Sequence, residues 1–93
     1  MPRESTIVNA IMRYLRTIPC SVAYKNHGST MGRAGRPDIE FFHGGKAWFF
    51  EVKVPGKKAT HVQRHELTRL RRAGCVAEVV TGVDMVHYIL GKA

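Results

Sequence analysis

Hydrophobic residues near the start of the chain recur every three or four positions, which is the spacing of one face of a helix. Arginines occupy the opposite face, and Pro19 is expected to end the helix. The pattern therefore predicts a helix over residues 4–18. Its apolar positions are Ile7, Val8, Ile11, Met12, Leu15 and Ile18.

Short apolar runs in the middle of the chain predict three strands. Residues 20–26 are the first candidate, and residues 38–43 and 46–54 are both rich in Phe, Ile, Val and Trp. Gly44-Gly45 separates the last two runs, which is typical of a β-hairpin. Residues 27–37 show no periodicity, and a loop of this length in a small domain is usually functional or mobile.

The rest of the chain alternates helix and strand. Thr60 and Gln63 match a capping box that opens a helix, which should run to about Ala73 with Gly74 as its C-terminal cap. Residues 75–80 form a fourth strand, and Asp84 is expected to cap a short closing helix. The predicted order is α-β-β-β-α-β-α.

The helix between the third and fourth strands predicts a right-handed crossover, which would make those two strands parallel. The expected fold is thus α/β, with a mixed sheet made of an antiparallel hairpin and a parallel βαβ unit, flanked by helices. Residues 1–93 are expected to form a single domain, because this length supports one modest core.

Two charged residues interrupt the apolar strand at residues 46–54. Side chains alternate along a strand, so Glu51 and Lys53 share one face while Phe50 and Val52 share the other. Asp38 lies at the mouth of the neighbouring strand, so the three polar residues could converge. The alternative is that Glu51 and Lys53 are solvated on a half-exposed strand and that Asp38 only forms a turn.

Two neighbouring carboxylates repel each other unless a cation lies between them, and oxygen ligands of this kind suit Mg²⁺ or Mn²⁺. A lysine beside such a site can orient or help deprotonate a water, or balance charge that builds on a phosphate. Asp38, Glu51 and Lys53 therefore outline a metal-dependent site for phosphodiester hydrolysis.

The segments RPDIEFF and WFFEVKVPGKKATHVQ resemble the bipartite signature of the PD-(D/E)XK nuclease superfamily, with Pro37-Asp38 followed by Glu51-Val52-Lys53. Glu4, Asn26 and Gln63 extend the resemblance to the VRR-Nuc family, the virus-type replication and repair nucleases, across nearly the whole chain. The chain is similar to a minimal stand-alone member. It has Gly35-Arg36-Pro37 where the family commonly has a glycine directly before Pro-Asp.

The resemblance implies a role for each of these residues. Asp38 and Glu51 would bind the metal together with the backbone carbonyl of Val52, and Lys53 would position the attacking water. Glu4 would be an outer ligand acting through water, and Gln63 would approach the site from its helix. Each of the last two has an equal structural alternative, since Glu4 suits a helix N-terminus and Gln63 can simply complete the capping box.

Charge indicates the partner. The 93 residues hold 15 Lys and Arg against 7 Asp and Glu, a formal net charge of +8, so a polyanion and above all nucleic acid is expected. A basic protein kept soluble by its charge is the alternative. The candidates for a DNA-binding rim are Lys25, Asn26, Arg33, Arg36, Lys46, Lys57 and Lys58.

One active site per chain implies a two-fold homodimer if two strands are to be cut symmetrically. Stand-alone VRR-Nuc proteins resemble resolvases of four-way (Holliday) junctions, so the expected substrate is branched DNA, read by shape and backbone. Three alternatives stay open: a nuclease that trims flaps or single strands, a restriction-type nuclease with base specificity, and a catalytically silent DNA-binding protein on the same fold.

The two cysteines, Cys20 and Cys75, lack metal-ligand spacing and are expected to be small buried residues in a reducing compartment. No signal-peptide pattern or long apolar run is present in the sequence. A cytoplasmic location in a bacterial or phage-infected cell is therefore expected, with no membrane and no organic cofactor.

Overall fold

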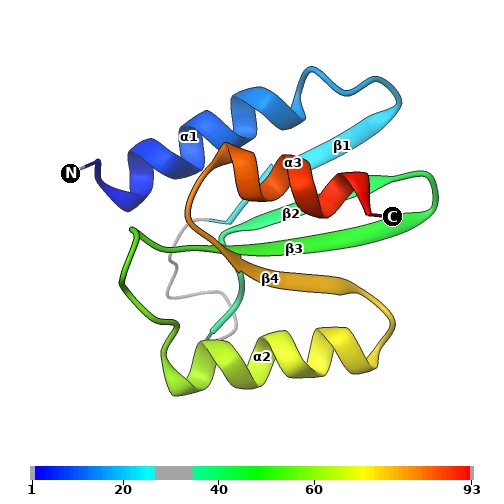
Figure 1. Ribbon diagram of the computed structural model, residues 1–93. Helices are drawn as coiled ribbons and strands as arrows, with labels where there is room; N and C mark the ends of the chain where they lie inside the picture. The colour runs from blue at the N-terminus through cyan, green and yellow to red at the C-terminus, as the bar shows by residue number, and fades with distance from the viewer. Residues whose placement is uncertain (1, 27–34, 93) are drawn as a thin grey trace.

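The computed structural model describes residues 2–26 and 35–92, and its elements follow the predicted order (Figure 1). The four strands form one sheet in the order β1-β2-β3-β4. Strands β1, β2 and β3 are antiparallel neighbours and β4 lies parallel to β3, so the predicted mixed sheet is confirmed. The elements are α1 (Glu4–Leu15), β1 (Ser21–Lys25), β2 (Ile39–His43), β3 (Lys46–Val52), α2 (His61–Arg72), β4 (Val76–Val80) and α3 (Val83–Gly91).

The hairpin between β2 and β3 turns at Gly44 and Gly45, whose φ angles are 59° and 76°. Two consecutive left-handed residues make a turn that matches the twist of paired strands, and only glycine adopts it without strain. The turn pairs His43 with Lys46 and Ile39 with Phe50. It therefore sets the register that brings the start of β2 beside the end of β3.

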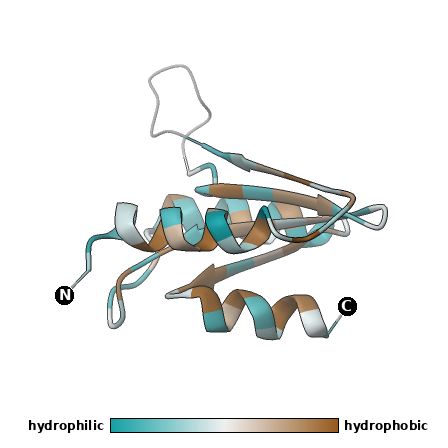
Figure 2. Cartoon of the chain, turned by 90° about the horizontal axis from the view of Figure 1, so that it is seen from above, coloured by the Kyte–Doolittle hydropathy of each residue, from teal (hydrophilic) through white to brown (hydrophobic). Residues whose placement is uncertain are grey.

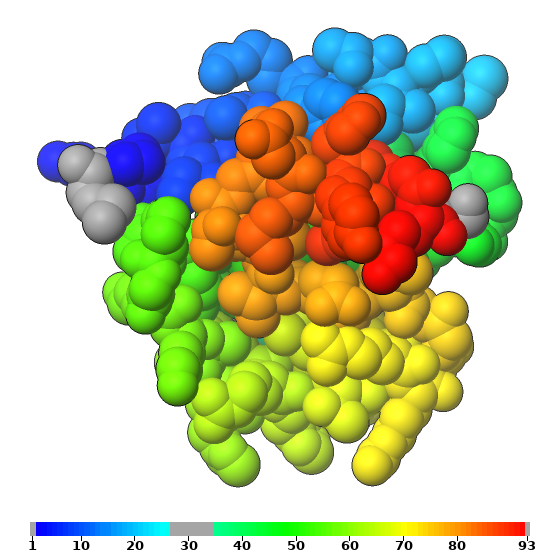
Figure 3. All heavy atoms as spheres, in the orientation of Figure 1, coloured from blue at the N-terminus to red at the C-terminus, as the bar shows by residue number. Residues whose placement is uncertain are grey.

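Helices α1 and α3 cover one face of the sheet and contact each other (Figure 3). The apolar face of α1 meets alternate residues of β2 and β3, and these residues make up the main core. This burial drives the association of helix and sheet. The core residues are Ile7, Val8, Ile11, Met12, Leu15, Ile39, Phe41, Trp48, Phe50, Val52, Val80 and Val86.

Helix α2 packs against β4 and β3, where Leu67 and Ala77 are buried outside the main core. Figure 2 shows hydrophobic and hydrophilic segments alternating along the helices, as expected when one side of each helix faces the sheet. The Thr60 hydroxyl accepts from the Gln63 amide, and the Thr60 amide donates to Gln63 Oε1, so the predicted capping box is confirmed.

The first helix is shorter than predicted. It ends at Leu15 instead of Ile18. The Thr17 hydroxyl donates a hydrogen bond to the Tyr14 carbonyl, and helical geometry is disfavoured for the residue before Pro19. The prediction that Asp84 caps the closing helix is also wrong. That helix begins at Val83 with Gly82 as its N-cap, so Asp84 lies within the first turn.

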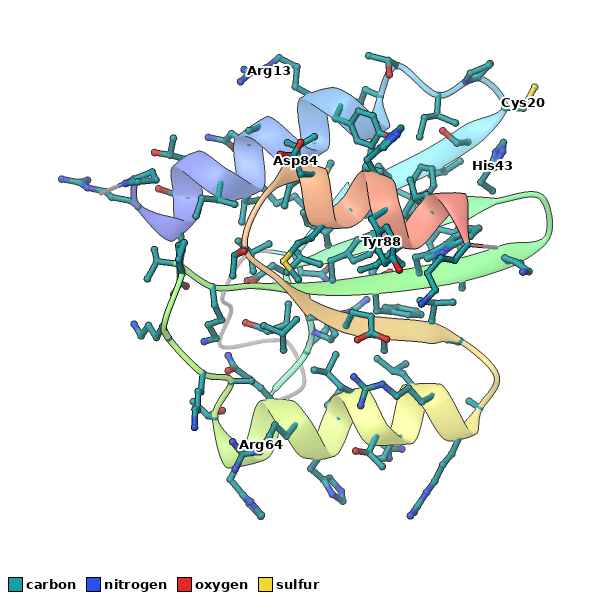
Figure 4. The ribbon with its side chains drawn as sticks, in the orientation of Figure 1. Arg13, Cys20, His43, Arg64, Asp84 and Tyr88 are labelled. Atoms are coloured by element: carbon teal, nitrogen blue, oxygen red, sulfur yellow. The ribbon has the colours of Figure 1, made fainter. Side chains whose placement is uncertain are left out.

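The prediction of two buried cysteines is wrong for Cys20, which is exposed, whereas Cys75 is half-buried. Cys20 follows Pro19 in the turn between α1 and β1, and its φ of 55° is left-handed. Its carbonyl contacts His43 Nδ1 at 3.2 Å, and Figure 4 shows both residues at the same end of the sheet. Among the described residues, no helix is long and apolar enough to cross a membrane.

Candidate active site

The site is built around Asp38, which lies between Pro37 and the first residue of β2. Continuing the β2–β3 ladder by one residue places Asp38 opposite Glu51, since Ile39 pairs with Phe50. Side chains directly opposite in such a ladder have Cβ atoms about 5 Å apart. Asp38 Oδ2 also accepts a hydrogen bond of 2.8 Å from the Val52 amide, which ties its carboxylate to the end of β3.

Asn26 supports the backbone that carries Asp38. Its amide donates to the Asp38 carbonyl at 2.7 Å, and its side-chain nitrogen donates to the Pro37 carbonyl at 2.7 Å and to Glu40 Oε2 at 2.9 Å. Glu40 is buried, and the Arg36 Nε donates to the same carboxylate at 2.8 Å. Three hydrogen-bonded side chains thus hold the mouth of β2 in one conformation.

Gly35 positions the same segment against α2. Its φ is 79°, and a Cβ at this position would lie 2.8 Å from both the carbonyl oxygen and Cγ1 of Val62. A side chain would therefore clash with the first turn of α2 and strain the backbone. The glycine lets the chain entering Pro37-Asp38 pass directly over that helix.

Glu51 and Lys53 project from the face of β3 opposite Phe50 and Val52. Both are buried, with only 2% and 6% of their surfaces exposed, and Lys53 Nζ lies 3.7 Å from Glu51 Oε2. The alternative of a solvated, half-exposed pair is thus wrong. A buried charge is costly unless it is paired, so two such residues at this depth need a partner or a function.

The environment of Glu51 favours its protonated form. Burial, then the Asp38 charge and a hydrogen bond with Asp38, raise its pKa from the ordinary 4.5 to about 8, although Lys53 pulls the pKa down and Glu4 raises it further. At neutral pH, Glu51 therefore keeps its proton beside the Asp38 carboxylate. Such a pair is a ready ligand set for a divalent cation, because the cation removes the repulsion that holds the proton.

Glu4 begins α1 at the edge of this cluster. It lines a hollow of about 310 Å³ together with Asp38, Asn26 and Lys25. Glu4 Oε2 is buried and has no hydrogen-bond partner among the described residues, and the nearest cation, Lys57 Nζ, is 3.7 Å away. An acceptor left open beside Asp38 fits an outer ligand that acts through water.

These observations fit a divalent metal. Within residues 2–26 and 35–92, no three Asp, Glu, His or Cys side chains surround a point closely enough to enclose an ion. Mg²⁺ rarely needs such a cage, since it is usually held by one or two carboxylates and keeps several waters. The Asp38 and Glu51 carboxylates meet that requirement, with Glu4 within reach of a bound water.

Gln63 is placed differently from the other predicted catalytic residues. Its side-chain oxygen accepts from the Thr60 amide, and it makes no hydrogen bond to Asp38, Glu51 or Lys53 within the described part of the chain. Two roles were predicted for Gln63, catalysis and the capping box, and the geometry directly supports the capping box.

The predicted DNA-binding rim is only partly gathered around the site. Lys25 lies beside Glu4 and Asp38, and Lys57 lies beside Glu4. Lys58 is exposed on the segment that leads to α2. Lys46, at the other end of β3, is about 17 Å along the strand from Glu51. Arg33 lies outside the described residues.

Arg36 and Asn26 were also predicted to contact DNA, but both donate hydrogen bonds to Glu40. Sequence reasoning did not single out Glu40. A usable signal existed, because Glu40 follows Asp38 at the two-residue spacing that made Glu51 and Lys53 conspicuous.

Comparison with solved structures supports the fold. No family model and no curated protein matches the sequence. Among solved structures, one described as a VRR_NUC domain is 26% identical, with a TM-score of 0.78 over 95% of this chain and 94% of that chain. A second, described as a VRR_NUC domain protein, is 18% identical and has a TM-score of 0.77 over 97% of this chain and 86% of that chain.

Both matches extend over nearly the whole of each chain. The fold they share is a four-stranded mixed sheet flanked by helices, which in this chain carries Asp38, Glu51 and Lys53 at adjoining strand ends. The chain thus has the fold of a VRR-Nuc domain, and its structural neighbours indicate a domain of the nuclease family.

Proposed function

We propose that the protein is a metal-dependent endonuclease that hydrolyses phosphodiester bonds in branched DNA, acting as a homodimer on four-way junctions. The observation that carries the proposal is that half-buried Asp38 meets the buried Glu51 and Lys53. Their carboxylates are adjacent, and the ammonium lies 3.7 Å from Glu51 Oε2. This arrangement is costly for folding and is explained by chemistry on a phosphate.

Asp38 and Glu51 would hold the metal, with the Val52 carbonyl as a further ligand and Glu4 contacting a bound water. When bound there, Mg²⁺ or Mn²⁺ would supply Lewis-acid chemistry and lower the pKa of a water ligand. Glu51 must release its proton to act as a ligand, since its pKa of about 8 keeps it protonated at neutral pH. The Val52 amide holds Asp38 in place throughout.

Lys53 would act on the water and on the phosphate. Only 7% of its side chain is exposed, so its charge is poorly screened by solvent and acts strongly at short range. It can orient the attacking water and offset the negative charge that builds on the phosphate in the transition state. Lys53 is therefore assigned as a catalytic residue, and Gln63 as a residue whose catalytic role needs a separate test.

The proposed substrate class rests on charge. The net charge of +8 favours a polyanion such as DNA, whose phosphates bind Lys and Arg. Contacts to the backbone position a protein without reading sequence. Recognition through backbone and shape would suit a branched substrate.

A homodimer is supported by an apolar surface on the sheet. Val22, Tyr24 and Phe42 are 46%, 56% and 36% exposed on neighbouring strands, and the Tyr24 and Phe42 rings lie 6.2 Å apart. Strand β1 is at the edge of the sheet, where exposed aromatic residues commonly mark an interface. Tyr24→Arg should convert a dimer to a monomer in sedimentation, whereas Tyr88→Arg on α3 should not.

The central experiment compares labelled four-way junction, flap, single-stranded and linear duplex DNA with Mg²⁺ or Mn²⁺. The proposal predicts paired nicks in the junction, little cutting of the linear duplex, and no product in EDTA. Glu51→Gln should abolish cleavage while leaving binding intact, because it keeps the shape of the side chain and removes a ligand charge.

Glu78→Gln is the matched control, since Glu78 lies on β4 and pairs with Arg71 at 3.6 Å. Its cleavage should equal that of the wild type, so that the loss in Glu51→Gln can be assigned to the site and not to the removal of any carboxylate. Cutting of flaps or single strands in preference to junctions would indicate a trimming nuclease instead of a resolvase. Binding without any metal-dependent product would indicate a silent DNA-binding protein.

A further inference from the structure

A groove runs between α1 and β1, from the carboxylate site toward the C-terminal end of α1. It consists of two adjoining hollows that share Asn9 and Lys25, whose side chains are joined by a hydrogen bond of 3.2 Å from Lys25 Nζ to Asn9 Oδ1. The first hollow, of about 310 Å³, contains Glu4 and Asp38. The second, of about 340 Å³, contains Arg13 and Arg16.

The polar side of the groove is one stripe of α1. Ser5, Asn9, Arg13 and Arg16 follow each other at intervals of three or four residues, so they lie on the same side of the helix. From Ser5 to Arg16 the helix rises about 17 Å. That length equals the rise of roughly five nucleotides along one strand of a duplex.

The second hollow is cationic and has no carboxylate. Its lining residues are Asn9, Met12, Arg13, Arg16 and Lys25. Neither Arg13 nor Arg16 forms an ion pair within residues 2–26 and 35–92, and Lys25 bonds only to the neutral Asn9 there. Three cations gathered on one surface repel each other, and an anion laid between them relieves that repulsion.

The arginines of α2 provide the contrast, because most of them are already engaged. Arg69 pairs with Glu66 at 2.8 Å, and Arg71 donates to the Ala77 carbonyl at 2.7 Å. Figure 4 shows Arg13 on α1 and Arg64 on α2 at opposite ends of the molecule, both directed away from the sheet. Free positive charge that adjoins the carboxylate site therefore lies along α1.

We propose that this groove, called here the α1 groove, holds the phosphate backbone of one DNA strand and guides it to Asp38 and Glu51. The inference rests on the proposed nuclease function and assigns Arg13 and Arg16 as positioning residues. No aromatic side chain lines either hollow. The groove is thus suited to charged backbone and not to stacking of unpaired bases.

The test measures binding and cleavage separately. Arg13→Gln/Arg16→Gln removes two charges from the groove, and Arg72→Gln/Lys92→Gln removes two from exposed positions at the ends of α2 and α3. Binding of a labelled four-way junction is followed by fluorescence anisotropy in EDTA at several salt concentrations. Circular dichroism checks that each variant is folded.

The groove variant should bind about tenfold more weakly and lower the slope of log K against log salt by roughly two, because two phosphate contacts are lost. The control should change affinity by less than about threefold, as expected for the loss of distant charge alone. Arg13→Lys/Arg16→Lys should keep the wild-type slope. In cleavage assays the loss should appear as a higher DNA concentration for half-maximal rate, since the arginines act on binding and neither touches the reacting atoms.

Equal losses of DNA affinity in the groove and control variants, or no loss in either, would overturn the proposal that the α1 groove binds DNA. A wild-type protein that binds through Arg13 and Arg16 but never cleaves would refute the nuclease function and leave the groove standing. Normal cleavage with an unchanged salt slope in the groove variant would refute the groove and leave the nuclease function standing.

Discussion

The end of strand β3 presents two faces that are both buried and differ in chemistry. Phe50 and Val52 are fully buried on the side of α1 and α3, where they fill the core. Glu51 and Lys53 are nearly as buried on the other side, where they meet Asp38. One face stabilises the fold by removing apolar surface from water, and the other holds charge at a cost to stability.

The comparison separates two kinds of buried residue that a burial profile alone would treat alike. Substitutions on the apolar face should change stability, and activity only as a consequence. Substitutions on the charged face should change activity while the fold persists. The variants below test that separation in order of decreasing effect.

Lys53→Met should lower cleavage of the preferred DNA by about 10³-fold, because the ammonium that orients water and balances phosphate charge is lost. Methionine fills a similar volume without a charge, so the melting temperature should stay close to that of the wild type or rise. Single-turnover cleavage and thermal denaturation measure the two effects. If this variant unfolded, or cleaved DNA normally, the assignment of stability to the apolar face and activity to the charged face would be wrong.

Phe50→Ala should reduce the free energy of unfolding by about 3–5 kcal/mol, since it leaves a cavity in the core beneath α1. Urea denaturation measures the loss, and Phe50→Leu should lose much less. At a temperature where the variant remains folded, its cleavage rate should be within a few-fold of the wild type. A large loss of activity in fully folded protein would mean that the apolar face also shapes the site.

Much of the apolar face could be predicted from the sequence because its signals are local. The three-and-four spacing in α1, the glycine pair at residues 44–45 and the capping box at Thr60 each specify an element without reference to distant residues. Errors arose at element ends. At Thr17 a side-chain hydrogen bond competes with the helix, and at Asp84 the helix starts one residue before the proposed cap.

The charged face was predictable only in outline. The pattern placed Glu51 and Lys53 on one side of a strand, but their burial depends on the packing of distant elements such as α2 against the sheet. The support of Asp38 by Asn26, Glu40 and Arg36 was missed, because the Asn26–Glu40 bond joins residues 14 positions apart in the sequence. No periodicity records such a contact.

The stability of the metal-free protein should fall as the pH rises from about 5 to 8. The folded protein holds the Glu51 proton more tightly than the unfolded chain does, since the pKa is about 8 instead of 4.5. Its contribution is therefore complete below pH 4.5 and is lost as the pH passes through 8. The expected loss over this range is roughly 3 kcal/mol, measured by urea denaturation in EDTA.

Glu51→Gln should remove this part of the pH dependence, because glutamine does not titrate. Glu78→Gln should retain the full slope, since Glu78 is half-exposed on the other side of the sheet. If wild type and Glu51→Gln gave parallel curves, the proposal that Glu51 holds a proton at neutral pH would be wrong. Added Mg²⁺ should flatten the wild-type curve by displacing the same proton.

Gln63→Ala should have the smallest effect, a loss of about 0.5–1 kcal/mol, because it breaks one of the two capping-box bonds at the start of α2. Gln63→Glu restores an acceptor for the Thr60 amide and should recover most of the loss. Well below the melting temperature, cleavage by Gln63→Ala should then match the wild type. A drop of more than tenfold that Gln63→Glu fails to reverse would instead place Gln63 with Lys53 on the charged face, as a side chain whose amide acts on substrate.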